Sequence, residues 1–343
     1  MEDANDGRQN KAVVTPAEEE SSARPSAATH RGPLNRRHAI LVVLLGAWVA
    51  VAAAGPAQQA DQFAGVALTT VRAGGNVYMV QRPGGGGNIG ALVGTDGVLL
   101  VDSLFAPLAD RLVAAVRQVS DQPIRFLINT HVHPDHIGGN EPLANRGVLI
   151  FAHDNVRLRA LERLRFPREG GQFVAQPAER ARPVVTYNDA IGMHINGEEV
   201  RAFLVPPAHT DGDSFVQFPQ SDVLHLGDVF RTTSYPIIDT YNGGSLAGTI
   251  KALDLAISLA GPSTKIIPGH GLSIVGREAL VEFRDMTVDI RDRVRALIQE
   301  RKTLAEVMTA GITARYDAKW GQEATWTAKD FIPIVYHELG GLN

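Results

Sequence analysis

Seven side chains of metal-binding type, grouped in four short glycine-containing clusters, constrain this chain more than any other feature of its sequence. Four of them are packed into the segment Thr130-His-Val-His-Pro-Asp-His-Ile-Gly-Gly139. The other three follow singly, at His209, Asp228 and His270. A divalent zinc ion takes three or four nitrogen or oxygen ligands, and two adjacent ions need a shared carboxylate or hydroxide between them. The set therefore predicts a centre for two metal ions.

The first cluster follows directly on a short apolar run, Ile124 to Asn129, which we predict to be a buried strand. Side chains two residues apart on an extended backbone point the same way, so His131 and His133 can face one ion. Pro134 cannot continue a strand ladder, and we expect the chain to turn there. The turn would carry the next two ligands, Asp135 and His136, towards a second ion.

Gly138 and Gly139 come directly after these ligands, and we expect them to let the backbone pass close to the site. The remaining three ligands each follow a strand-like apolar segment, namely residues 200 to 205, 223 to 226, and 266 to 267. Strand ends that converge on one edge of a sheet sandwich form a pocket there.

In order, spacing and residue type, these ligands resemble the metallo-β-lactamase superfamily of zinc hydrolases, across roughly residues 66 to 300. The resemblance implies an α/β (α+β) fold, a four-layer αβ/βα sandwich with the metals in a groove at one edge. It also implies two Zn2+ ions per chain. Carried over by position, His131, His133 and His209 would hold the first zinc, Asp135, His136 and His270 the second, and Asp228 would bridge them.

Two differences from the ligand patterns of known branches indicate which part of the superfamily this chain resembles. Many metallo-β-lactamases use a cysteine ligand on the second zinc, and this chain has no cysteine. The aspartate at position 228 is instead similar to the glyoxalase II, lactonase and phosphodiesterase-like branches, in which a carboxylate bridges both ions. Flavodiiron-type relatives carry a glutamate where this chain has His133, which disfavours a redox di-iron role.

The predicted mechanism follows from such a centre. Two zinc ions lower the pKa of a bridging water towards neutrality and so supply a hydroxide without a side-chain nucleophile. This hydroxide would attack the carbonyl of a β-lactam, lactone, ester or thioester, and a zinc ion would take up the oxyanion charge. We expect Asp135 to be the catalytic residue, orienting the hydroxide and passing a proton to the leaving group.

The N-terminal part has a different composition. Residues 1 to 38 are polar and contain no aromatic residue, and we expect them to be disordered. Arg36-Arg37, the apolar run 39 to 54 and small residues up to position 57 form the layout of a signal peptide, with a membrane anchor through 39–54 as the alternative. The paired arginines weakly resemble a twin-arginine signal. We therefore expect an exported, periplasmic enzyme whose catalytic domain, residues 62–343, ends in further helices.

The formal net charge of −4 gives no electrostatic reason to expect nucleic acid, so the expected partner is a small-molecule substrate. The sequence carries no signal for the oligomeric state. Two alternatives share the ligand pattern: a mononuclear iron oxygenase of the persulfide dioxygenase kind, and a non-catalytic metal-binding protein.

Several residues outside the ligand set are candidates for roles near the site. In the segment 234 to 245 we predict Tyr235, Tyr241 and Asn242 as substrate contacts, unless the segment is simply a turn with Ser245 capping a helix from Leu246 to Leu259. His225 is close enough to Asp228 in sequence to support it. The arginine-rich stretch 154 to 166 predicts a helix, with either a solvated face or a rim for an anionic substrate.

Overall fold

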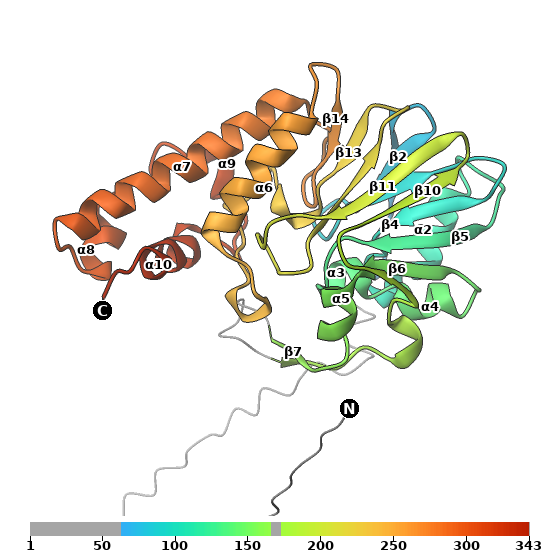
Figure 1. The fold of residues 1–343 in the computed structure, drawn as a ribbon, viewed down its shortest axis with the longest axis horizontal. Coiled ribbons are helices and arrows are strands. Elements are labelled where there is room, and N and C mark those ends of the chain that lie inside the picture. The colour runs from blue at the N-terminus through green and yellow to red at the C-terminus, as the bar shows by residue number, and fades with distance from the viewer. Residues whose placement is uncertain (1–62, 166–172, 343) are drawn as a thin grey trace, which may run out of the picture. The chain divides into compact units, whose positions relative to one another are not determined.

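A computed structural model describes residues 63–165 and 173–342 (Figure 1). The segments 1–38 and 39–57, with the predicted disordered region and signal peptide or anchor, lie outside the described residues. Within the two described ranges, none of the helices combines the length and the apolar character that a membrane span needs.

The first sheet is mixed, and its first four strands are antiparallel neighbours. The next three pair in parallel with one another and with the fourth. In spatial order the strands are β1 (Thr69–Gly74), β2 (Val77–Gln81), β3 (Ile89–Leu92), β4 (Val98–Val101), β5 (Ile124–Asn129), β6 (Leu149–His153) and β9 (Val185–Tyr187).

The second sheet is antiparallel except for its last pair, β13 and β14. Its strands are β10 (Ala190–Ile195), β11 (Glu198–Leu204), β12 (Ser214–Phe218), β13 (Val223–His225) and β14 (Lys265–Ile267). A separate two-stranded ribbon joins β7 (Leu164–Arg165) and β8 (Phe173–Val174).

The helices lie between strands and, in the last quarter of the chain, follow one another. The α-helices are α2 (Ala109–Val116), α3 (Pro134–Ile137), α4 (Asn140–Ala144), α5 (Asp154–Arg159), α6 (Leu246–Leu259), α7 (Arg277–Gln299), α8 (Leu304–Thr309), α9 (Asp317–Trp320) and α10 (Ala328–Glu338). Short 3₁₀ turns are η1 (Ala106–Leu108), η3 (Glu179–Ala181), η4 (Gly227–Val229) and η5 (Thr240–Asn242).

Three hydrophobic clusters define the layers. One contains side chains of both sheets, such as Met79 and Val216, so the sheets pack face to face. A second lies on the other side of the first sheet, where Leu112 of α2 and Leu143 of α4 cover it. The third joins the second sheet to α6, α7 and the C-terminal helices. The order helix, sheet, sheet, helix is the four-layer sandwich that the resemblance implied (Figure 1).

The fold corrects the prediction for the arginine-rich stretch. The helix α5 ends at Arg159, whereas the sequence predicted a helix up to residue 166. Leu158 and Leu161 are 59% and 42% exposed, so the stretch has no continuous apolar face that a longer helix could bury. Leu164 is buried instead in the short strand β7.

Candidate metal centre

The four-residue ligand cluster leaves the end of β5 as predicted. His133 has an extended backbone, with φ −69° and ψ 150°, and it caps α3, whose first residue is Pro134. Proline suits this position because its missing N–H has no partner in the first turn of a helix. The helix carries Asp135 and His136 away from the direction of His131 and His133.

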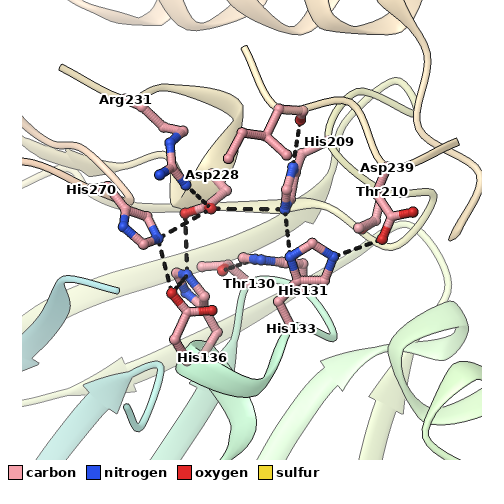
Figure 2. A network of polar contacts seen from close by, with 12 residues as sticks. Thr130, His131, His133, His136, His209, Thr210, Asp228, Arg231, Asp239 and His270 are labelled. Atoms are coloured by element: carbon pink, nitrogen blue, oxygen red, sulfur yellow. Dashed lines mark hydrogen bonds and ion pairs between the residues drawn. The ribbon is translucent and has the colours of Figure 1, made fainter. Parts of the chain in front are cut away.

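The three single ligands also lie where strands end, as predicted. His209 follows β11, Asp228 lies in η4 directly after β13, and His270 follows β14. Figure 2 shows the labelled histidines and Asp228 converging from these separate segments on one small region. Strand ends at one edge of the sandwich therefore bring together residues up to 139 positions apart in sequence, from His131 to His270.

The structure forms two ligand groups and a link between them. In the first, His131, His133 and His209 offer ring nitrogens that all lie within 4.8 Å of one another. The Nε2 of His209 is 3.0 Å from the Nδ1 of His133. The second group joins Asp135, His136 and His270 within the same limit.

Asp228 lies between the two groups. Its Oδ1 is 3.1 Å from the Nε2 of His136, and its Oδ2 is 3.2 Å from the Nε2 of His270 and 3.8 Å from that of His209. With His131 and His136 it forms a third possible ligand group. This position suits a carboxylate shared by two ions, the role that the resemblance implied for Asp228.

The donor set fits metal ions because buried ligand atoms lack hydrogen-bond partners. Among the described residues, these atoms include the Nε2 of His131, His136 and His270, and the Oδ1 of Asp228. On two of these rings the other nitrogen is occupied: the Nδ1 of His131 is 3.0 Å from Thr130 Oγ1, and that of His136 is 2.7 Å from Asp102 Oδ2. A buried polar atom without a partner is costly, and metal ions bound at the two ligand groups would satisfy these atoms.

The two groups differ in charge. Burial lowers the pKa of His131 well below its usual value and that of His209 to about 3, so both imidazoles are neutral. Although burial opposes it, the carboxylates of Asp228, Asp135 and Asp102 raise the pKa of His136 well above its usual value. The second group is thus rich in negative charge, which attracts cations.

Buried residues beyond those predicted from the sequence also orient the candidate ligands. Asp102 accepts hydrogen bonds from the backbone N–H and the hydroxyl of Thr130, both at 2.7 Å, besides its contact with His136. Asp239 Oδ2 lies 2.8 Å from the Nε2 of His133. A carboxylate that holds the outer nitrogen of a ligating histidine fixes the tautomer and strengthens the ligand.

A sequence signal for Asp102 existed, because it directly follows the apolar run of β4 just as Asp228 follows β13. Its backbone has φ 67°, a conformation in which aspartate and asparagine are enriched. Asp239 lies inside the segment that we had singled out, but three of its neighbours were named instead.

The structure places these three residues, Tyr235, Asn242 and Tyr241, in different environments. Tyr235 is fully buried, stacks on Phe331 at 5.7 Å between ring centroids and donates to Asp317, so its prediction as a substrate contact is wrong. Asn242 is buried and contacts Asp239, which makes it part of the support of His133. Tyr241 is 43% exposed, with the guanidinium of Arg165 over its ring.

Two further predictions can be compared with the structure. His225 accepts from the backbone N–H of Gly227 and lies 3.2 Å from the carbonyl of Asn88, so it supports the turn that carries Asp228. The close approach at Gly139 is to the backbone of Ser103, where an added Cβ would come within 2.1 Å of the carbonyl oxygen. This glycine therefore serves packing beneath the ligand loop.

The chain matches a family model described as the metallo-beta-lactamase superfamily over residues 82–270, more than half of its length. Among curated relatives it is similar to a linear primary-alkylsulfatase of a Pseudomonas species, 26% identical over 57% of this chain and 43% of the relative. It is also similar to the alpha subunit of a 2,4-dinitroanisole O-demethylase of a Nocardioides species, 26% identical over 56% and 55% of the two chains. A metallo-beta-lactamase type 2 of Bacillus cereus is 23% identical over 51% and 63%.

Solved structures share the fold. An inverting sec-alkylsulfatase of a Pseudomonas species has a TM-score of 0.59 at 18% identity, over 83% of this chain and 52% of the other. A metallo-beta-lactamase from Pontibacter korlensis has a TM-score of 0.53 at 17% identity, over 65% and 99%. The chain spans about half the length of the curated alkylsulfatase and O-demethylase relatives. With the family model covering both ligand groups, this chain belongs to the metallo-beta-lactamase superfamily.

Proposed function

We propose that this chain is a hydrolase with a two-zinc centre held by the seven ligand residues. The observation that supports it most is the convergence of buried ligand atoms that lack hydrogen-bond partners within the described residues. The superfamily's mostly hydrolytic members support the reaction class. His131, His133 and His209 would hold one ion, Asp135, His136 and His270 the other, and Asp228 would serve both.

When bound, two such ions supply a hydroxide at neutral pH and polarise the bond under attack. The protein's own contribution is orientation. Asp135 is the most accessible of the candidate ligands, with 18% of its side-chain surface exposed, followed by His270 at 11% and His133 at 10%, whereas His136 is fully buried. A substrate would therefore approach from the side of Asp135. Asp135 is positioned there to orient the attacking water and to pass a proton to the leaving group.

We propose a small molecule with an activated carbonyl, such as a lactone, ester, thioester or β-lactam, as the substrate. The names of the relatives widen the panel that should be tested, because they include an alkylsulfatase, an O-demethylase and a β-lactamase. Fold and metals set the reaction class, while the loops around the site set specificity. An alkyl sulfate ester therefore belongs in the same panel.

We further propose export to the periplasm through the leader at 39–57, with retention as a membrane anchor the competing outcome. The support is the sequence layout of a basic pair, a short apolar run and small residues. Expression of the full chain in a bacterial host, followed by N-terminal sequencing of the protein in the periplasmic and membrane fractions, tests this. Cleavage near residue 57 supports a signal peptide, and an intact chain in the membrane supports an anchor.

The test of the hydrolase is metal content together with turnover of the substrate panel, with and without a chelator. We expect about two zinc ions per chain and chelator-sensitive hydrolysis. His209→Ala should lower turnover by more than about 100-fold, since even outer partners of ligands are worth about 10–100-fold. His194→Ala is the matched control, because this histidine is exposed on β10.

Two other results would replace the proposal. About one iron per chain, with oxygen consumption and no hydrolysis, would identify the oxygenase alternative. Tightly bound metal with no turnover of any panel member would favour the metal-binding protein.

A further inference from the structure

A buried cation, the guanidinium of Arg231, contacts the candidate metal centre. Its side chain is 1% exposed, and its Nη1 donates to the Oδ2 of Asp228 at 2.6 Å. The other donors are also used, since Nε donates to Ser234 Oγ at 2.9 Å and Nη2 to Glu323 Oε2 at 2.8 Å. Figure 2 shows the contact of Arg231 with Asp228. Together the three contacts fix the guanidinium in one orientation.

This contact makes the two oxygens of Asp228 different. Oδ2 accepts from Arg231, whereas Oδ1 is buried without a hydrogen-bond partner and faces His136 at 3.1 Å. An ideal Cβ on Gly269 would come within 2.2 Å of this Oδ1, so only a glycine leaves the carboxylate room in this position. Oδ2 also lies 3.2 Å from the Nε2 of His270 and 3.8 Å from that of His209, so Arg231 holds the carboxylate while both of its oxygens face candidate ligand histidines.

Glu323 comes from the C-terminal part of the chain, beyond the residues 82–270 that match the family model. Other contacts join this part to the same loop. Tyr235 N–H donates to the carbonyl of Trp320 at 3.0 Å, and the indole N–H of Trp326 donates to the carbonyl of Pro236 at 3.1 Å. The loop between α9 and α10 therefore reaches the candidate metal centre through the side chain of Glu323.

We propose that Arg231 and Glu323 form a positioning pair that fixes Oδ2 of Asp228 and so sets how the carboxylate presents its two oxygens to metal. The inference rests on the proposed function, since it assumes that Asp228 binds metal. Arg231 places a positive charge beside the centre, where it opposes the binding of cations unless another charge offsets it. Glu323 supplies that offset, and it is 24% exposed on its other side.

The expected effects follow from these roles. Glu323→Gln keeps the shape but leaves Arg231 with Asp228 as its remaining carboxylate partner, and Arg231→Gln removes both the charge and the hold on Oδ2. Arg231→Gln should weaken zinc binding by about 10–100-fold, the usual effect of losing an outer partner of a ligand, and Glu323→Gln by about tenfold, because Glu323 acts through Arg231. Arg231→Lys should not restore affinity, because a lysine cannot make three directed contacts at once.

The experiment measures zinc affinity by competition with a chromophoric chelator, and the visible spectrum of the cobalt-substituted protein, for the full chain and each variant. Tyr235→Phe is the matched control, because it removes the hydrogen bond to Asp317 between the same two parts of the chain without touching a ligand. We expect Tyr235→Phe to lower the melting temperature but to leave zinc affinity and the cobalt spectrum unchanged.

If Glu323→Gln and Arg231→Gln both bind zinc within about twofold of the parent's affinity, the positioning pair is overturned. A tenfold change in affinity corresponds to about 1.4 kcal/mol. If Arg231→Gln fails to fold, the partly exposed Glu323→Gln decides alone. A parent chain that binds no zinc would overturn this inference together with the proposed function. A parent that binds two zinc ions beside unaffected variants would overturn the inference only.

Discussion

The two sheets supply the centre in different ways. The seven-stranded sheet contributes four ligands from one loop after β5, and neighbouring residues hold that loop: Ser103 donates to the carbonyl of His136 at 2.9 Å and to Asn140 at 2.8 Å. The five-stranded sheet contributes three ligands from three strand ends. The loop between η4 and η5 holds them: His209 Nδ1 lies 2.6 Å from the carbonyl of Ile237, and Thr232 N–H donates to the carbonyl of His270.

The difference shows two ways of building a precise site. One half relies on a compact sequence motif, the other on distant segments that pack together. In the second half the loop is itself held by the C-terminal helices, through contacts such as Trp326 with Pro236. Orientation in that half therefore depends on tertiary packing of a region that contributes no ligand.

The largest effect should come from the accessible carboxylate of the first half. We expect Asp135→Asn to lower kcat by about 10²–10⁴-fold, because the amide can neither accept nor pass on a proton. Metal content is measured on the same sample, so that loss of chemistry is distinguished from loss of an ion. A variant with full zinc and full turnover would rule out the catalytic role of Asp135.

Next in size is Asp102→Asn, which tests how the first half holds His136. Asparagine tolerates the φ of 67°, so the backbone should survive. Its amide N–H₂, however, would face the Nδ1 of His136 or the hydroxyl of Thr130, both of which contact Oδ2 in the parent. We expect zinc affinity to fall by about 100-fold, measured by chelator competition. Unchanged affinity would mean that the ligand loop holds His136 without this carboxylate.

Asp239→Asn tests the point where the second half supports the first. Asp239 lies in the loop that holds His209, yet its Oδ2 contacts His133 at 2.8 Å. It also accepts from the backbone N–H groups of Tyr241 and Asn242, both at 3.1 Å. Because an amide oxygen can keep part of these contacts, we expect a smaller loss of zinc affinity, about tenfold. If Asp239→Asn loses more zinc affinity than Asp102→Asn, the carboxylate of the second half matters more for metal binding than that of the first half.

The same division explains what the sequence could predict. The convergence of the seven candidate ligands could be predicted, because each follows an apolar strand and the strand ends of one edge meet by geometry. The pair that holds Asp228 was missed, because Arg231 and Glu323 are 92 residues apart and nothing local to either indicates the other. Tyr235 was misassigned for a related reason, since only the packing of Phe331 against it shows that it belongs to the core.

The smallest effect should come from the helix that follows the loop of the second half. Ser245 accepts from the backbone N–H of Gly248 at 3.0 Å and so caps α6, as predicted. We expect Ser245→Ala to reduce the free energy of unfolding by about 1 kcal/mol in denaturant titrations, the usual worth of such a cap.

Thr303→Ala is the matched control, because Thr303 caps α8, which contributes no candidate ligand to the centre. Both variants should lose similar stability and keep the zinc affinity of the parent. Asp239 is held by its own contacts with His133 and Asn242, which do not pass through the cap. If zinc affinity falls for Ser245→Ala but not for the control, the start of α6 also orients the candidate ligands of the second half. The packing of the C-terminal region would then not be sufficient to hold them.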